Sequence, residues 1–190
     1  MINRRLLLTR SVVAAAAAWL LPAGRGALAQ PRYAISAAAL QEAVEQRFPR
    51  RLRLGGLLEL TVRSPVLKLL PDANRIASDL VVVASGRGLE RPATGEFDLD
   101  FALRYERSDQ TLRARGLRVR SLRVSGLPAP YPELLDGLGP VLAQQVFSEI
   151  VLHRLRPADL ALADGLGLEP DTVTVTTEGL VIGFAPKLAR

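Results

Sequence analysis

The chain has 190 residues, with 25 lysine and arginine residues against 19 acidic ones, one histidine and no cysteine. The missing cysteine excludes disulfides, thiolate metal sites, a cysteine nucleophile and a lipid-modified cysteine, and the single histidine excludes a two-histidine metal site within one chain. A hydrophobic content of 48% with 23% charged residues is typical of a globular chain, and the length fits one domain with a processing segment.

Residues 1–29 have the pattern of an export signal. Basic residues precede an apolar run over 11–21, and the small-residue stretch that follows ends in Ala27-Leu28-Ala29, so we place cleavage after Ala29. The apolar run is about half the ~20 residues of a membrane-spanning helix, which argues against a permanent membrane anchor. Arg4-Arg5 before two leucines resembles a twin-arginine motif, but an ordinary Sec signal explains the same residues, so both routes stay open.

Removal of this segment changes the charge balance. Four arginines and no acidic residue lie within it, which leaves 21 basic against 19 acidic residues in a single expected domain over 30–190. Nucleic-acid-binding proteins concentrate a basic excess on one face. The near balance therefore argues against a nucleic-acid partner.

The first elements expected in this domain are a helix and two strands. Ser36 is a good N-cap, and Leu40 and Val44 follow at helical spacing, which predicts a helix over 37–47. Alternating apolar residues then predict a strand over 57–62, interrupted near Pro65 and continued over 66–70.

Three longer segments predict the centre of a sheet. A turn over 71–74 leads to a strand over 75–84, whose unalternated Leu80–Val83 centre is typical of a strand covered on both faces. Residues 86–95 are expected to form a loop, and 96–106 alternate most cleanly. In the strand expected over 111–124, the alternation slips at Gly116 and near Ser121. Two β-bulges there would restore one apolar face and bend the sheet strongly.

The remaining elements complete an α+β fold. A proline-rich break over 128–132 precedes a short helical turn, and Pro140 suits the first position of a well-buried helix that runs to about His153. Residues 171–176 and 180–184 predict a closing hairpin. The order of elements favours a strongly curved antiparallel sheet wrapped around this long helix, with the N-terminal helix also packed on the concave face.

This layout resembles the YceB-like bacterial lipoproteins, the family of domain of unknown function 1439. The similarity covers about residues 35–184. It rests on apolar spacing in five segments: Ile35-Ser36 with Leu40 and Val44, the strand Leu58–Val62, the turn Pro71–Ile76, the helix Val141–Val151, and Leu180–Phe184. The resemblance implies a small relative of tubular lipid-binding domains, with an apolar groove and no established activity. Those relatives carry a lipid-modified cysteine that this chain lacks, which implies a soluble periplasmic version.

The candidate ligand site is an apolar groove between the sheet and the Pro140–His153 helix. A concave, mostly apolar lining could hold an acyl chain. The same periodicity also fits a closed core in which these residues pack on one another. The residues expected to line it are Leu60, Val62, Leu80, Val82, Phe97, Leu99, Phe101, Leu103, Val146, Phe147 and Ile150.

A second candidate is a set of arginines on the strand over 111–124. With a bulge at Gly116, the first four share the outward face and could meet phosphate or lipid headgroups; the simpler interpretation is cross-strand pairing with Glu96, Asp98 and Asp100 on the solvated face. The arginines are Arg113, Arg115, Arg118, Arg120 and Arg123.

No motif predicts catalysis. The alternation puts Asp98 and Asp100 on the solvent face, and the position of His153 near a helix end needs no chemistry to explain it. No Gly-x-Ser-x-Gly elbow and no glycine-rich phosphate loop occurs, so we expect no catalytic residue, metal or cofactor.

Two functions follow from these features. The first is a non-catalytic periplasmic protein that binds a lipid or another hydrophobic molecule in the groove. The second is an envelope protein-interaction or assembly module with a filled core and no cargo, in which a sheet edge such as 57–62, or the proline-rich 128–132 segment, is the contact surface.

Overall fold

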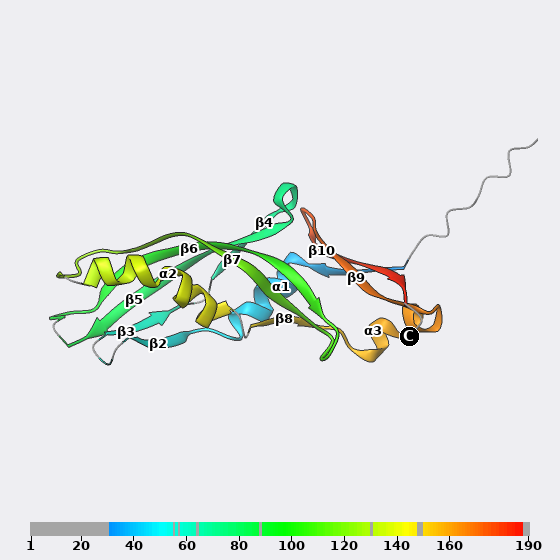
Figure 1. The fold of residues 1–190 in the computed structure, drawn as a ribbon, viewed down its shortest axis with the longest axis horizontal. Helices are drawn as coiled ribbons and strands as arrows, with labels where there is room; N and C mark the ends of the chain where they lie inside the picture. The colour runs from blue at the N-terminus through cyan, green and yellow to red at the C-terminus, as the bar shows by residue number, and fades with distance from the viewer. Residues whose placement is uncertain are drawn as a thin grey trace, which may run out of the picture.

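The computed structural model describes residues 31–187 except positions 55, 57, 64, 88, 130, 148 and 149, so the expected export signal lies outside the described residues. A large curled sheet and a small sheet follow one another along the long axis of the molecule, with α-helices beside them (Figure 1). Within the described ranges, no helix is long and apolar enough to cross a bilayer.

The large sheet is antiparallel and open. Its strands follow the order β2-β3-β5-β6-β7-β8, with β4 paired to β5 beside this path. The strands are β2 (Arg50–Leu54), β3 (Leu58–Val62), β4 (Val66–Leu70), β5 (Arg75–Gly86), β6 (Ala93–Glu106), β7 (Thr111–Val124) and β8 (Val151–Arg154). The expected α+β class with a strongly curved antiparallel sheet is confirmed.

The expected closing hairpin belongs to a separate sheet. It consists of β9 (Leu168–Val175) and β10 (Gly179–Pro186), and β10 also pairs with β1 (Arg32–Ser36), which the sequence pattern did not reveal. This small sheet has the order β1-β10-β9, so β9 lies at one of its edges.

Three α-helices occur in the described part of the chain. They are α1 (Ala37–Glu45), α2 (Tyr131–Phe147) and α3 (Pro157–Gly165), and Pro71–Ala73 forms a short 3-10 turn, η1. The Ser36 side chain accepts a hydrogen bond from the backbone N–H of Ala39 and so caps α1. The buried Leu40 and Val44 fix its inward face.

The curvature arises from β7. The register of β7 against β6 shifts at two places, between Asp98 and Leu99 and between Asp100 and Ala102, which confirms both predicted bulges. Gly116 supplies the backbone for one of them, with φ of 56°. The bulges keep Leu112 and Leu122 in contact with the core on either side of the bend.

Two predictions, one about the centre of β5 and one about the segment that follows it, are wrong. The Leu80–Val83 centre of β5 is not covered on both faces, because Val81 remains 42% exposed on the convex side. The 86–95 segment is not entirely loop, because β6 begins at Ala93. Apolar content alone does not reveal how many layers cover a sheet, since the covering elements come from elsewhere in the chain.

The prediction of a helix from Pro140 to about His153 is also wrong. The helix α2 begins nine residues earlier, at Tyr131, contains Pro140 in its interior and ends at Phe147. Residues 151–154 form β8 instead, because they pair with the start of β7 through Thr111, Leu112 and Arg113. Long-range pairing decides this segment, whose short apolar run fits either a helix or a strand.

Candidate functional site

The structure brings all eleven predicted groove residues together. Every one belongs to a single apolar cluster, and their exposed fractions range from 0 to 9%. The strands contribute residues from the concave face of β3, β5 and β6, while Val146 and Phe147 come from α2 and Ile150 lies just before β8. Alternation within each strand aims these side chains to the same side of the sheet.

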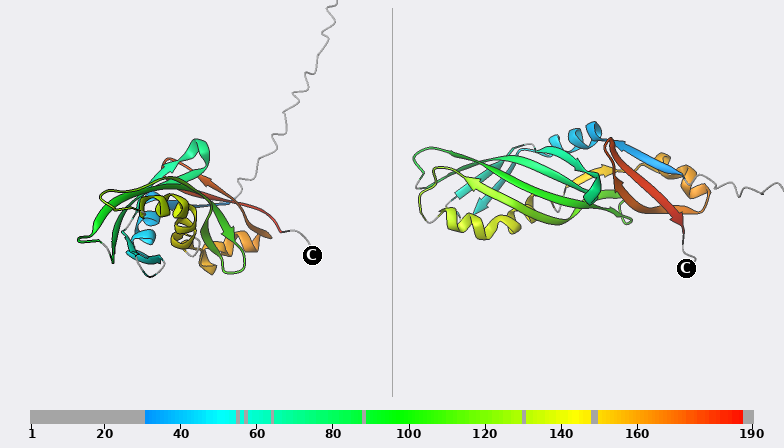
Figure 2. Two further views of the ribbon diagram at one scale, coloured as in Figure 1. Left: turned by 60° about the vertical axis from the view of Figure 1, so that its left-hand side comes forward. Right: turned by 90° about the horizontal axis from the view of Figure 1, so that it is seen from above.

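The helix α2 covers the concave side of the sheet. Figure 2 shows it beneath the arch of the large sheet, and it packs closely against β7. Its outward surface includes the half-exposed Val141. Its inward surface is apolar and buried, and consists of Leu135, Leu142, Ala143, Val146 and Phe147. Leu40 and Val44 of α1 belong to the same buried cluster, so α2 and α1 together cover the concave face.

The interior is filled by its own side chains. Phe147 lies 5.3 Å from Phe101 and 6.2 Å from Phe48 between ring centroids, and Phe101 and Phe147 have no exposed surface. A cavity large enough for an acyl chain would leave its lining side chains accessible to water-sized probes. The described residues around these rings therefore form a packed core in this state.

One polar group interrupts this core. Ser78 on β5 is fully buried. In the described part of the chain, its hydroxyl oxygen has no hydrogen-bond partner. Strand alternation places Ser78 on the same face as Ile76 and Leu80. Leaving such a hydroxyl unpaired costs about 1–3 kcal/mol, so it needs an explanation.

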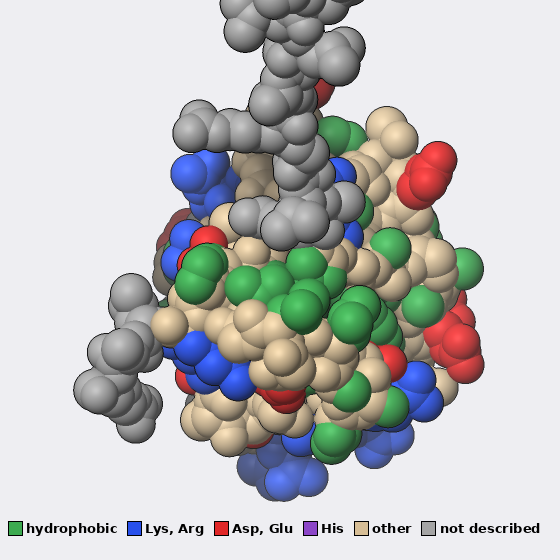
Figure 3. All heavy atoms as spheres, turned by 90° about the vertical axis from the view of Figure 1, so that its right-hand side faces the viewer, with side chains coloured by type: hydrophobic (Ala, Val, Ile, Leu, Met, Phe, Trp, Pro, Cys, Tyr) green, Lys and Arg blue, Asp and Glu red, His purple; other side chains and the backbone are tan. Residues whose placement is uncertain are grey.

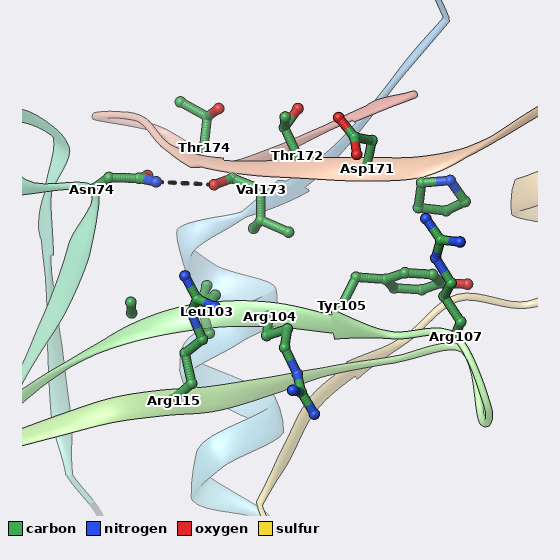
Figure 4. A pocket seen from close by; sticks show the side chains of 12 residues that line it. Asn74, Leu103, Arg104, Tyr105, Arg107, Arg115, Asp171, Thr172, Val173 and Thr174 are labelled. Atoms are coloured by element: carbon green, nitrogen blue, oxygen red, sulfur yellow. Dashed lines mark hydrogen bonds between the residues drawn. The ribbon is translucent and has the colours of Figure 1, made fainter. Parts of the chain in front are cut away.

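A surface cleft lies where the two sheets meet. Its volume is about 420 Å³, and its lining comes from β6, β7 and β9 together with Asn74 (Figure 4). Asn74 donates a hydrogen bond to the backbone oxygen of Val173 (3.1 Å) and accepts one from the N–H of Val175 (2.7 Å), so it holds the free edge of β9. Figure 4 shows the Arg115 side chain extending from β7 toward β6.

This cleft is a structural junction between the two sheets. Arg107 forms an ion pair with Glu169 at 2.9 Å, which joins the end of β6 to β9. Burial raises the pKa of the Tyr105 hydroxyl, and the nearby carboxylates of Asp164, Asp109 and Glu169 raise it further. The side chains here connect the two sheets, and we assign them no acid–base chemistry.

Within the ranges that the structure describes, ion pairs engage two of the five arginines predicted on this face. Arg120 donates to Asp100 at 2.9 Å, and Arg113 pairs with Asp109. The cross-strand interpretation therefore holds for Arg120. Alternation puts Asp100 on the outward, convex face as predicted, but its exposure to solvent is wrongly predicted, because Arg75 and Arg120 cover it and leave the residue 5% exposed.

His153 lies on β8 and not near a helix end. Its Nε2 is 3.4 Å from the hydroxyl oxygen of Tyr33 on β1, and the two rings lie 5.9 Å apart between centroids. Burial lowers the pKa of His153, and this effect outweighs the opposing influence of Asp159. The contact links the large sheet to the small one.

The end of the molecule formed by the small sheet and α3 carries exposed apolar side chains. Figure 3 faces this end and shows hydrophobic side chains among charged ones. Leu162 and Leu166 are 69% and 61% exposed. Two neighbouring cations are paired with acids, Arg156 with Asp159 and Lys187 with Asp164.

The predicted contact edge over 57–62 is wrong. Strand β3 is paired on both sides, with β2 and β5, so it offers no free edge. The edge strand is β2, a short segment with three arginines that sequence reasoning missed. The signal available was the Arg-Arg-Leu-Arg-Leu alternation at 50–54, which fits an edge strand protected by charge.

No cluster of histidine and acidic side chains suited to a metal ion occurs among the residues that the structure describes. Comparison with protein-family models found no matching family, and comparison with curated proteins found no matching relative. The candidate site is therefore defined by its geometry alone.

Proposed function

We propose that this chain is an exported, non-catalytic protein that binds a lipid or another hydrophobic ligand between α2 and the concave face of the large sheet. The observation that carries the proposal is the helical cover: an open, curled sheet presents a continuous apolar face, and α2, with α1 beside it, covers that face. The resemblance to YceB-like proteins and the expected export signal point to the periplasm.

The proposed ligand replaces the contacts that α2 makes with the sheet. Exposing the four large inward side chains of α2, leaving Ala143 aside, costs roughly 6–12 kcal/mol, at about 1.5–3 kcal/mol each. An acyl chain with about 12 methylenes gains roughly 10 kcal/mol on burial, at about 0.8 kcal/mol per methylene. The two terms are of the same order, so exchange of helix contacts for ligand contacts is energetically feasible.

The unpaired hydroxyl of Ser78 supports the same proposal. A polar ligand group or a ligand-associated water that reaches the concave face gives this hydroxyl the partner that the side chains around it do not supply. The remaining lining is apolar, in keeping with a ligand that is mostly hydrocarbon and carries few polar atoms.

A disulfide between α2 and β7 tests the proposal. A Cβ added at Gly139 would lie 3.4 Å from Cγ1 of Val119, so cysteines at these two positions are close enough to bridge. The native chain has no cysteine that could compete. We expect Gly139→Cys/Val119→Cys to bind a fluorescent fatty-acid probe when reduced and to exclude it when oxidised.

The reduced double variant and the two single variants are the controls. Equal probe binding by the oxidised and reduced forms, with the bridge verified by mass spectrometry, would show that the ligand does not enter beneath α2. Native mass spectrometry of protein recovered from the periplasm supplies an independent readout. A ligand-free mass alone, together with no probe binding, would contradict the proposal.

The packed interior favours a second candidate, an envelope interaction module with no cargo. The near-zero exposure of Phe101 and Phe147 is the observation behind it. In that case, in-cell crosslinking would recover a specific protein partner, and locking α2 onto β7 would leave that partner's binding unchanged.

A further inference from the structure

The edge strand β2 lies in the densest basic stretch of the described chain, although β7 carries five arginines over a longer span. Four arginines and no acid occur over 47–53, in a domain whose expected net charge is close to zero. We name the exposed Arg47, Arg51 and Arg53 the β2 arginine cluster. Arg50 is half-buried and lies opposite Val62 in the ladder, so it faces the concave side and is not part of the cluster.

The cluster lies along a free edge. Strand β2 is the first strand in the order of the large sheet, and β3 is its only partner among the described strands. Arg51 pairs across the ladder with Thr61 and Arg53 with Glu59, and alternation turns both away from the buried Leu58, Leu60 and Val62. The side chains of Arg51 and Arg53 therefore project from the convex side of the sheet at its rim, and Arg47 lies just before the strand.

The cluster also lies beside the proposed ligand site. Phe48, between Arg47 and Arg50 in the chain, contacts the ring of Phe147 at the end of α2. Leu52 packs against the apolar core from the concave side of β2. The rim with the arginines thus borders the space between sheet and helix.

Among the described residues, little negative charge neutralises the β2 arginine cluster. Glu59 lies 3.6 Å from Arg53, whose side chain is still 85% exposed. Within the described residues, no carboxylate pairs with Arg47 or Arg51. Arg87 adds a cation, because it lines the same 180 Å³ hollow as Arg53.

We propose that the β2 arginine cluster docks the protein on an anionic phospholipid surface, with the rim of the sheet facing the bilayer. The charge complementarity identifies this partner: clustered, exposed arginines on a rim attract acidic headgroups at about 1 kcal/mol each. The transfer of a lipid from that bilayer to the space beneath α2 rests on the proposed function; the docking itself does not.

Edge protection is the competing explanation, because charged side chains prevent a free strand from pairing with another chain. Charge reversal separates the two explanations. Glutamates at the edge still block strand pairing, but they repel acidic headgroups. The test variant is therefore Arg47→Glu/Arg51→Glu/Arg53→Glu, measured by flotation with phosphatidylglycerol and phosphatidylcholine vesicles at low and high salt.

The matched control reverses three arginines elsewhere. Arg115→Glu/Arg118→Glu/Arg123→Glu on β7 changes the net charge by the same amount. We expect the cluster variant to lose at least about 100-fold in affinity for phosphatidylglycerol vesicles at low salt, and the control variant to lose much less. Equal losses in both variants, or none in either, would overturn the docking site.

Two further measurements complete the test. The triple Arg→Lys variant keeps the charge, and we expect it to bind the anionic vesicles nearly as well as the native chain. A Glu variant that stays monomeric on gel filtration, with no preference of the native chain or the Lys variant for anionic vesicles, would establish edge protection alone. Equal competition by soluble glycerol phosphate would indicate a small-anion site and overturn docking on a bilayer.

The same variants distinguish failure of the docking from failure of the proposed function. We expect the Glu variant to bind the fluorescent fatty-acid probe normally in the absence of vesicles. Vesicle binding without any probe binding by the native chain would leave the docking site standing and remove the ligand site. Probe binding by the native chain without a preference for anionic vesicles would leave the ligand site standing and remove the docking site.

Discussion

Arg75 on β5 and Asp100 on β6 form an ion pair on the convex face of the large sheet, with side-chain exposures of only 11% and 7%. Arg120 on β7 donates a second hydrogen bond to the same carboxylate at 2.9 Å. Arg75 also donates to the backbone oxygen of Gly116, at the bulge. Asp100 therefore ties three neighbouring strands together where β7 bends.

Replacing Asp100 with Asn tests this connection between the three strands. We expect Asp100→Asn to lower the free energy of unfolding by about 3 kcal/mol, because it leaves the guanidinium of Arg75 nearly buried without a counter-charge. Urea denaturation measures the change. The matched control is Asp79→Asn, which removes an exposed pair with Lys68 and should cost less than about 1 kcal/mol. Equal losses in the two variants would contradict a special role for Asp100.

Asp100 should also make stability depend on pH in the acid range. Burial alone would raise its pKa, but the hydrogen bonds from Arg120 and Arg75 outweigh burial and hold the pKa below the ordinary 3.8. The unfolded chain therefore takes up the proton first as pH falls. This contribution to stability is complete above about pH 3.8 and disappears as pH falls through the lower folded pKa. We expect a shallower acid dependence for Asp100→Asn, measured by urea denaturation; parallel curves would contradict this.

His153 should add a separate dependence at higher pH. Burial lowers its pKa below 6.5, so the folded protein prefers the neutral ring and the unfolded chain binds the proton first. The stabilising contribution is present above pH 6.5 and is lost as pH falls through the folded pKa. Because His153 is the only histidine, its NMR titration is unambiguous. A pKa at or above 6.5, or the same pH slope in His153→Gln, would refute this account.

The bulge at Gly116 gives a test of backbone conformation. Gly116 has φ of 56°, and an added Cβ would meet only the end of the Arg75 side chain, at 4.0 Å. We expect Gly116→Ala to destabilise the protein by about 1 kcal/mol through backbone strain and not through a clash. Gly137→Ala in α2 is the control: its Cβ would meet nothing within 4 Å, so it should stabilise by up to about 1 kcal/mol. Thermal unfolding of both variants measures these two stability changes, and a similar change in both would contradict the role of backbone strain at Gly116.

The buried hydroxyls of Ser78 and Thr111 form a natural comparison. No described residue hydrogen-bonds the Ser78 hydroxyl, whereas the Thr111 hydroxyl donates to Asp109 at 2.6 Å and accepts from Arg113 at 3.0 Å. We expect Ser78→Ala to be neutral or stabilising in the ligand-free protein, and Thr111→Val to cost about 1–2 kcal/mol. A marked loss of stability in Ser78→Ala would show that the hydroxyl has a partner in the ligand-free state.

The amino-acid sequence by itself determined the strands of the large sheet that alternate clearly. In β6, the spacing of Phe97, Leu99 and Phe101 identifies the buried face, because side chains in a strand point to opposite sides in turn. In β7, the breaks in alternation at Gly116 and near Ser121 locate both bulges. These are local signals, so they can be read without knowledge of the rest of the fold.

Other features depend on partners that are distant in the chain. Residues 151–154 become a strand because the start of β7 is available to pair with them, and β1 forms because β10 provides an edge. Neither segment has enough alternation to signal a strand on its own. The burial of Asp100 likewise requires Arg75 and Arg120 to converge from two other strands.

The interior shows most clearly the difference between what the sequence determines and what the tertiary structure decides. The sequence determined which residues are apolar and inward-facing, and all eleven predicted groove residues meet in one cluster. Only the tertiary structure decided that their side chains fill the space beneath α2, because a lined cavity and a packed core require the same residue types at the same spacing. The tertiary structure also placed the arginines of β2 on a free rim, since which strand ends a sheet is set by pairing and not by composition.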